Sequence, residues 1–218
     1  MSLALFDLDE TLISCDCSSE WSNYMIKQGW VEDKRAFLQR NEELIQQYAL
    51  GEMDLADYMH LTLAPLRGRR QQDVAQLINQ FVEEIIAPCV YPAAWECLAQ
   101  HRANGDRIVI ISASGEHLVT PIARYLGVDE SLSIGVVIQE ACFTGAIQGV
   151  MSYREGKVTR LLELLNQDKT QLRHASFYSD SNNDLPLLSQ VGHPIVVNPD
   201  AILLQHAQQA GWPVYRWS

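Results

Sequence analysis

Two carboxylates stand two residues apart at the end of an apolar run near the N-terminus. The stretch reads ALFDLDETLISCDCSSEW over residues 4–21, and Asp7 and Asp9 follow a segment with the composition of a buried strand. Like charges at this separation repel each other, and burial strengthens the repulsion. In an extended segment the side chains of residues i and i+2 leave the same face. The pair therefore either ends in water or faces something cationic.

Two further apolar segments end in polar side chains. Residues 108–111 lead into Ser112-Ala113-Ser114, and the segment HASFYSDSNND contains Asp180, with Asn183 and Asp184 just beyond it. Ligands of an open parallel sheet bind at the carboxyl ends of its strands, so neighbouring strands would bring these groups together. A carboxylate cluster needs a cation, and Mg²⁺ with retained waters suits an oxygen-rich ligand set. Each acid taken alone could equally be a helix N-cap.

Strands that alternate with helices are expected to position these groups. The alternation predicts βαβ units, and hence an α/β fold with a mostly parallel sheet and helices on both faces. We expect helices at about 92–103, 116–126 and 155–166 and in DAILLQHAQQAG, strands at 108–111, near 134–138 and in PIVVN and PVYRW, and a hairpin around CFTGAIQGVM.

A long helical block interrupts this alternation after the first strand. From about Ser18 to Ile86 the apolar residues recur at helical spacing, and Gly29, Gly51 and the sequence PLRG divide the block into three or four helices. We interpret the block as an insertion into the α/β core. The predicted domains are an α/β core of residues 1–14 and 90–218 and an all-helical cap of residues 15–89.

Composition narrows the classes of function. A chain of 218 residues that is 47% hydrophobic suits one sizeable domain with an insertion. A formal net charge of -11 argues against nucleic acid or an anionic membrane as the partner, whereas a small anionic substrate can still bind a locally positive site. The five cysteines are an odd number, which favours a reducing compartment. With neither a signal-peptide pattern nor a membrane-spanning run, we expect a cytoplasmic protein, and an oligomer is possible.

Four short motifs carry a resemblance to a known family. DLDET, IISAS, GKVTRL and SDSNND stand in the order of the four motifs of the haloacid dehalogenase superfamily. Those motifs are DxDx[TV], an apolar strand that ends in Ser or Thr, a Lys near a helix start, and an acidic strand end with a second acid nearby. The helical insert between the first two motifs resembles the C1-capped branch, subfamily IB, similar to phosphoserine phosphatases. The resemblance implies a Rossmann-like core with a helical C1 cap.

The resemblance also implies a Mg²⁺-dependent phosphatase that works through an aspartyl-phosphate. It makes Asp7 the nucleophile and Asp9 the group that protonates the leaving alkoxide and then activates water. The metal would be held by Asp7, the backbone carbonyl of Asp9 and Asp180, with Asp184 supporting the metal shell. Thr11 would fix the turn after the strand.

The resemblance also assigns residues that would contact the phosphate group of the substrate. Lys157 would offset charge between the nucleophile and the phosphate; the alternative is a solvated lysine, with Arg154 and Arg160 nearby to take its role. The substrate phosphate would be bound by Ser112, the backbone amide of Ala113, and Asn183.

The leaving group of the substrate is less defined. In phosphoserine phosphatases an acid after the first motif and a cap arginine bind the amine and the carboxylate of serine. By spacing, these positions fall on Asp16 and near His60, and a neutral imidazole does not replace the bidentate fork of arginine on a carboxylate. The sequence RGRR at 67–70 could compensate, or be a solvated basic loop. The substrate is expected to be a small phosphomonoester, either phosphoserine or another amino-alcohol phosphate such as histidinol phosphate.

Other functions remain compatible with the same residues. A phosphotransferase would pass the phosphoryl group from Asp7 to an acceptor alcohol. A phosphoacceptor signalling protein also joins acids, a Ser or Thr and a Lys around Mg²⁺, but Asp9 should speed hydrolysis of its phospho-aspartate. A non-catalytic phosphometabolite binder would not need every catalytic position to be filled.

Overall fold

The computed structural model describes residues 2–49 and 54–218. In these residues seven strands form one sheet in the order β4-β3-β2-β1-β5-β6-β7. Only the β3–β4 pair is antiparallel, and the other neighbouring strands run parallel. The predicted α/β, Rossmann-like fold is confirmed. The strands are β1 (Leu3–Phe6), β2 (Arg107–Gly115), β3 (Glu130–Gln139), β4 (Cys142–Gln148), β5 (Ser176–Ser179), β6 (His193–Val197) and β7 (Val214–Tyr215).

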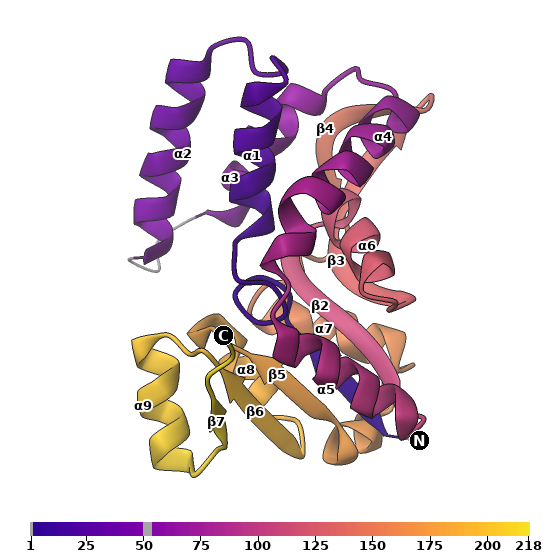
Figure 1. Cartoon of the computed structure of the whole chain (residues 1–218), viewed down its shortest axis with the longest axis vertical. Helices are drawn as coiled ribbons and strands as arrows, with labels where there is room; N and C mark the ends of the chain where they lie inside the picture. Colours follow the sequence, from indigo (N-terminus) through magenta and orange to yellow (C-terminus); the bar gives the residue numbers. More distant parts are fainter. Residues whose placement is uncertain (1, 50–53) are drawn as a thin grey trace.

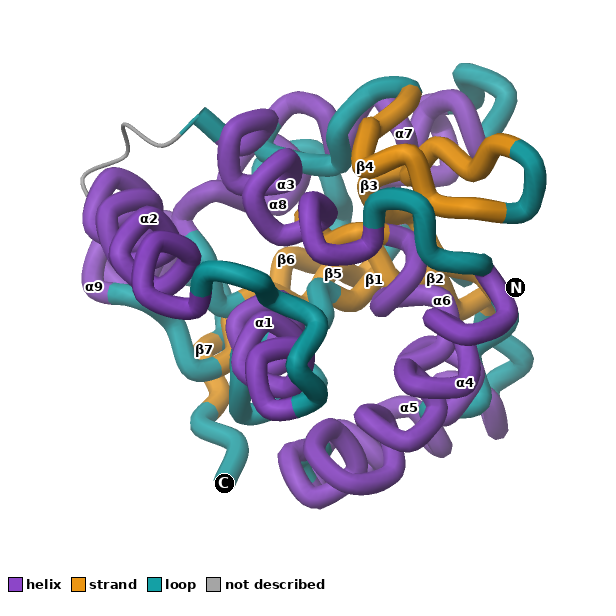
Figure 2. The backbone as a smooth tube through the Cα atoms, turned by 90° about the horizontal axis from the view of Figure 1, so that it is seen from above, coloured by secondary structure: helices purple, strands orange, loops and turns teal. Residues whose placement is uncertain are grey.

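Helices cover both faces of this sheet, and the alternation of side chains along β1 explains why. Ala4 and Phe6 belong to an apolar cluster with helices α5 and α6, whereas Leu3 and Leu5 belong to a second cluster with α7, α8 and α9. Figure 2 shows α5 and α6 on one side of the strands and α7 and α8 on the other. These helices are α5 (Pro92–Ala103), α6 (Glu116–Tyr125), α7 (Glu155–Leu164), α8 (Leu185–Leu188) and α9 (Ala201–Ala210).

In its described part, the segment between β1 and α5 consists of helices joined by turns and loops, with no strand longer than an isolated bridge. Figure 1 shows its α-helices in the upper half of the view, at the same height as β3 and β4. The break expected at Gly51 lies outside the described residues. The helices are α1 (Cys17–Lys27), α2 (Lys34–Ala49), α3 (Leu55–Leu63) and α4 (Gln71–Phe81), followed by a π-helical turn at Val82–Ile86.

This helical segment shares interior packing with the sheet. Trp21 of α1 and Phe81 of α4 lie in the same buried cluster as Phe6 of β1. Backbone hydrogen bonds also tie the segment to β4, since the Gly68 amide donates to the Phe143 carbonyl at 2.8 Å. The division into a core and a cap at residues 15 and 89 stays a prediction.

Two strands are longer than the periodicity indicated. The strand expected at 108–111 spans Arg107–Gly115, and its pairing with β3 shifts register between Ile111 and Gly115. The strand expected at 134–138 spans Glu130–Gln139, because it pairs with β2 at its start and with β4 at its end. The expected helix at 92–103 is found with the same bounds. Within the described residues we find no helix with both the length and the apolar character needed to cross a membrane.

Candidate active site

The polar ends of three neighbouring strands meet at one edge of the sheet. Strand β1 lies between β2 and β5, and the Asp7 amide that follows it donates to the Tyr178 carbonyl of β5 at 2.9 Å. A cavity of about 700 Å³ opens at this edge. Its lining includes these residues singled out from the sequence: Asp7, Asp9, Asp16, Ala113, Lys157, Asp180, Asn183 and Asp184.

Lys157 lies buried between two carboxylates. Its Nζ donates to Asp7 Oδ1 at 2.8 Å and to Asp184 Oδ2 at 2.8 Å, and its side chain is 3% exposed. Burial alone would lower the pKa of this lysine, but the charges of Asp184 and Asp7 raise it above the usual range. Lys157 is therefore not the solvated surface lysine of the alternative interpretation.

The position of Lys157 depends on its neighbour in the first turn of α7. A Cβ atom built on Gly156 would lie 1.9 Å from the Met151 carbonyl oxygen. The backbone can pass this close only without a side chain. The glycine in GKVTRL therefore permits the tight turn from Met151 into the start of α7, next to Lys157.

Asp9 accepts hydrogen bonds from two separate parts of the chain. The Cys17 amide donates to its Oδ1 at 2.7 Å, and the Ser114 hydroxyl donates to its Oδ2 at 2.9 Å. Burial raises the pKa of Asp9 to about 7, with further contributions from the charges of Asp16 and Asp7. A carboxyl group with this pKa is present in both protonation states near neutrality, so it can donate or accept a proton.

Asp180 faces the same cluster from the end of β5. Thr11 Oγ1 donates to its Oδ1 at 2.9 Å, which ties the turn after β1 to β5 as expected for Thr11. Burial and then the charges of Asp7 and Asp184 raise the pKa of Asp180 well above its usual value. The same effects raise the pKa of Asp184 to about 6, although Lys157 opposes them.

This crowding of carboxylates fits a hard cation. In the described residues no three His, Cys, Asp or Glu side chains form a ready-made metal cage. Mg²⁺ does not require one, because it is usually bound through one or two carboxylates together with waters and substrate phosphate. Asp7 and Asp180, whose charges repel each other, are a donor set of that kind.

Three other predicted residues differ in where they lie. Ser112 is buried behind the cavity wall, and its hydroxyl is 3.4 Å from Asp9 Oδ2. Asp16 lines the cavity, and its Oδ1 accepts from the Ser19 amide at 2.6 Å as the N-cap of α1. His60 is exposed and is not among the lining residues. Helix α3 turns Leu55 and Tyr58 toward the cavity instead, because its helical period places His60 on another face.

The motifs left several lining or supporting residues unidentified. Ser114 holds Asp9, and the Ser18 hydroxyl donates to Ser114 Oγ at 3.1 Å. Tyr153 and Arg154 line the cavity just before α7. Ser114 belongs to a polar strand end that the sequence already indicates, two residues after Ser112, but no motif gives it a role.

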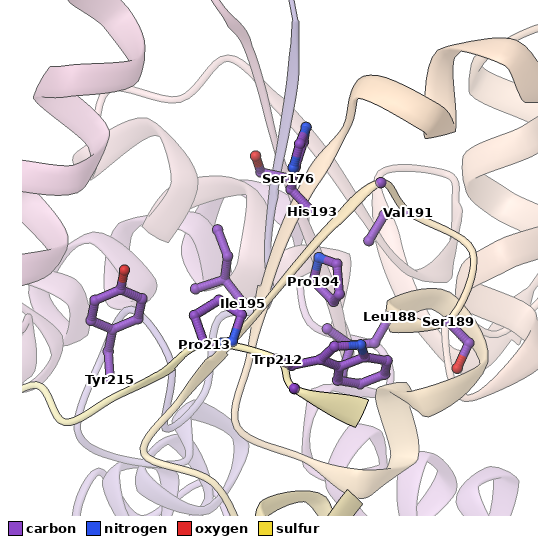
Figure 3. A pocket seen from close by; sticks show the side chains of 12 residues that line it. Ser176, Leu188, Ser189, Val191, His193, Pro194, Ile195, Trp212, Pro213 and Tyr215 are labelled. Carbon is purple, nitrogen blue, oxygen red and sulfur yellow. The ribbon is translucent and has the colours of Figure 1, made fainter. Parts of the chain in front are cut away.

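A second cavity, of about 630 Å³, lies at the opposite edge of the sheet, where β5 and β6 begin at Ser176 and His193. Figure 3 shows the apolar side chains of Pro194, Ile195 and Trp212 around it. None of its described lining residues is Asp, Glu, Lys or Arg. It therefore offers no charged group for phosphoryl chemistry.

Comparisons with known proteins agree with this geometry. A family model described as haloacid dehalogenase-like hydrolase matches residues 4–189. A histidinol-phosphatase of Neisseria meningitidis serogroup C is 36% identical, over 98% of this chain and 97% of that protein. A solved protein of unknown function from Bordetella pertussis Tohama I is 33% identical, with a TM-score of 0.90 over 98% of this chain and 97% of that one. A substrate-bound phosphoserine phosphatase shares the fold, with a TM-score of 0.70 at 17% identity over 99% of this chain and 92% of that one.

Proposed function

The chain belongs to the haloacid dehalogenase-like hydrolase family, and we propose that it is a Mg²⁺-dependent phosphatase of a small phosphorylated metabolite. One observation carries the proposal. Lys157 Nζ lies 2.8 Å from a carboxylate oxygen of both Asp7 and Asp184, while the nearby Asp9 has a pKa raised to about 7 by burial. A nucleophile held by a buried cation beside an acid that titrates near neutrality suits a two-step displacement.

In the first step a carboxylate oxygen of Asp7 attacks phosphorus, and the bond from phosphorus to the leaving oxygen breaks. Lys157 donates to Asp7 Oδ1, so Oδ2 is the oxygen that attacks. Protonated Asp9 gives its proton to the leaving alkoxide. Mg²⁺, when bound by Asp7, the Asp9 carbonyl and Asp180, supplies positive charge that offsets the phosphoryl oxygens.

In the second step the aspartyl-phosphate on Asp7 is hydrolysed. Asp9, now a carboxylate, accepts a proton from water as the water attacks phosphorus, and inorganic phosphate leaves. The hydrogen bonds from Cys17 and Ser114 keep Asp9 in one orientation through both steps. The Ala113 amide and Asn183, which line the cavity, are proposed to hold the phosphate oxygens.

The charges of the cavity favour a leaving group that carries an amine and no carboxylate. The two cations of the lining are Lys157, which already pairs with carboxylates, and Arg154, which lies beside Asn183. We therefore propose an amino-alcohol phosphate such as histidinol phosphate, which the similarity to a histidinol-phosphatase supports. Phosphoserine is the second candidate. The acidic lining residues are Asp7, Asp9, Glu10, Asp16, Asp180, Asp184 and Asp200.

Asp16 is proposed to bind the amine of the substrate. The Asp16→Asn variant tests this, because Asn caps a helix as well as Asp does and the negative charge is lost. Since the Asp16 charge also raises the pKa of Asp9, the readout is the ratio of the activities on histidinol phosphate and on the aryl phosphate at one pH. Asp54→Asn is the matched control, since Asp54 caps α3 through the Ala56 amide and is exposed. The location is proposed to be cytoplasmic, because all five cysteines are free thiols.

The experiment is phosphate release with Mg²⁺ from histidinol phosphate, phosphoserine and a generic aryl phosphate. We expect kcat/KM to be at least about tenfold higher for histidinol phosphate than for phosphoserine. Asp16→Asn should remove this preference while keeping the aryl phosphatase activity, and Asp54→Asn should change neither. An inactive wild type over a broad panel, or full activity of Asp7→Asn, would refute the proposed function.

A further inference from the structure

Arg154 has a backbone conformation that side chains rarely adopt. It precedes α7 with φ 50° and ψ -122°, and it lies half-buried in the wall of the active-site cavity. Such a conformation costs free energy for an L-residue, and it persists only where the surrounding structure requires it. A function that needs this side chain at this place is one such requirement.

The contacts of Arg154 fix the orientation of a neighbouring amide. Its Nε donates to Asn183 Oδ1 at 2.9 Å, and the Tyr153 hydroxyl donates to the same oxygen at 3.1 Å. The guanidinium also lies over the Tyr153 ring at 5.0 Å. Since two donors meet one oxygen, the other end of the Asn183 amide is the donating NH₂ group. Asn183 Nδ2 is thus the donor end of the amide, and one of its acceptors is Ser181 Oγ at 3.3 Å.

The charge of Arg154 is the least compensated positive charge in the cavity wall. Lys157, the other lining cation, already lies between Asp7 and Asp184. Among the ion pairs found in the described residues, none includes Arg154. A phosphate group that enters brings about one and a half to two negative charges into a wall rich in carboxylates. A planar guanidinium with N–H groups left to donate is suited to bind such oxygens.

We propose that Arg154 is a phosphate-binding residue, whose Nη groups donate to the substrate phosphate while its Nε holds the Asn183 amide toward the same phosphate. This inference rests on the proposed function. It assigns Arg154 to the phosphate and not to the leaving group, because its partner Asn183 lies on the loop that follows β5, between Asp180 and Asp184. Every phosphomonoester should therefore depend on Arg154 to a similar extent.

The test uses Arg154→Gly and Arg154→Lys in the full chain. Glycine adopts a positive φ without strain, so Arg154→Gly removes the guanidinium without threatening the backbone. We expect Arg154→Gly to raise KM at least about tenfold for histidinol phosphate and for an aryl phosphate alike, and to weaken inhibition by inorganic phosphate by a similar factor. Its thermal unfolding midpoint should equal or exceed that of the wild type. Arg154→Lys keeps the positive charge but not the planar fork of the guanidinium. Its KM and its inhibition by phosphate should therefore lie between those of the wild type and of Arg154→Gly.

Arg124→Ala is the control, since Arg124 is exposed near the end of α6 and does not line the cavity. Unchanged KM and unchanged phosphate inhibition in Arg154→Gly would overturn the inference. A loss confined to substrates with a carboxylate would overturn it too, because Arg154 would then bind the leaving group. If the wild type hydrolyses no phosphomonoester, the proposed function is refuted. Titration calorimetry with inorganic phosphate then still tests whether Arg154 binds phosphate. Equal phosphate affinity of wild type and Arg154→Gly, or no binding to either, would refute it.

Discussion

Replacing Lys157 with Met leaves two buried carboxylates without their shared cation. The side chains of Lys157 and Asp184 are 3% and 2% exposed, and that of Asp7 is 11% exposed. Removing one partner of a buried ion pair typically costs about 3–5 kcal/mol, because the remaining charge is uncompensated. We expect Lys157→Met to lower the free energy of unfolding by about this amount at pH 8 without Mg²⁺, and to abolish phosphatase activity.

The cost should depend on pH with a definite sign. The pKa of Asp184 is about 6 in the folded chain, raised chiefly by burial, against an ordinary value of 3.8. A raised carboxyl pKa means that the stability associated with this group is fully present below pH 3.8 and lost as the pH rises through the folded pKa. Without Lys157 the folded pKa rises further, and each added unit is worth about 1.4 kcal/mol. The deficit of Lys157→Met relative to wild type should therefore be smaller at pH 5 than at pH 8.

Urea unfolding followed by tryptophan fluorescence measures this deficit. With a urea dependence of about 1–3 kcal/mol per molar, the midpoint at pH 8 should fall by roughly 1–5 M. Lys169→Met is the control, because Lys169 is exposed. Adding Asp184→Asn to Lys157→Met removes one of the two uncompensated buried carboxylates and should restore part of the lost free energy of unfolding. A deficit below about 1 kcal/mol, or one that grows on acidification, would contradict this account of the ion cluster.

Three further predictions concern single residues. Asp9→Asn should slow hydrolysis of an alkyl phosphate by about 10²–10⁴-fold and of an aryl phosphate, whose leaving group needs no proton, by less, as initial rates on the two esters will show. Burial lowers the pKa of His117 from 6.5 to about 4, so stability should fall by up to about 3 kcal/mol as the pH drops from 6.5 toward 4; urea unfolding of His117→Phe should lack this loss. Gly156→Ala should reduce both the unfolding midpoint and the activity, because its Cβ would meet the Met151 carbonyl at 1.9 Å.

The sequence predicted where the acids would gather because the rule behind it is topological. Asp7 and Asp180 each follow a buried strand, and β1 and β5 are parallel neighbours, so their carboxyl ends share an edge. The local pattern was sufficient for this, since it required only strand ends and the order of elements. The family resemblance, and not the topology, placed Lys157 near a helix start, and the glycine before it permits the tight turn that leads into α7.

The directions in which side chains of the helical segment point were harder to predict from the sequence than the positions of the acids. Spacing from the first motif pointed to His60, but which face of α3 looks toward the cavity depends on how the helix packs. Leu55 and Met59 are buried one turn apart, and this period leaves His60 exposed. The periodic apolar residues of α3 indicate which face of the helix is buried. The number of residues between α3 and the first motif does not.

The hydrogen bonds and the pKa of Asp9 could not be predicted from the local sequence. One oxygen accepts from the Cys17 amide, eight residues away, and the other from Ser114, 105 residues away. The first bond comes from the start of α1 and the second from the end of β2, within the register shift between Ile111 and Gly115. The pKa of Asp9 also depends on burial and on the charge of Asp16, the N-cap of α1. The type and spacing of Asp9 identify a candidate acid, but its proton affinity is set jointly by the sheet and by helix α1. A change in the first turn of α1 should therefore alter the pH dependence of the reaction even where it leaves Asp7 and Lys157 in place.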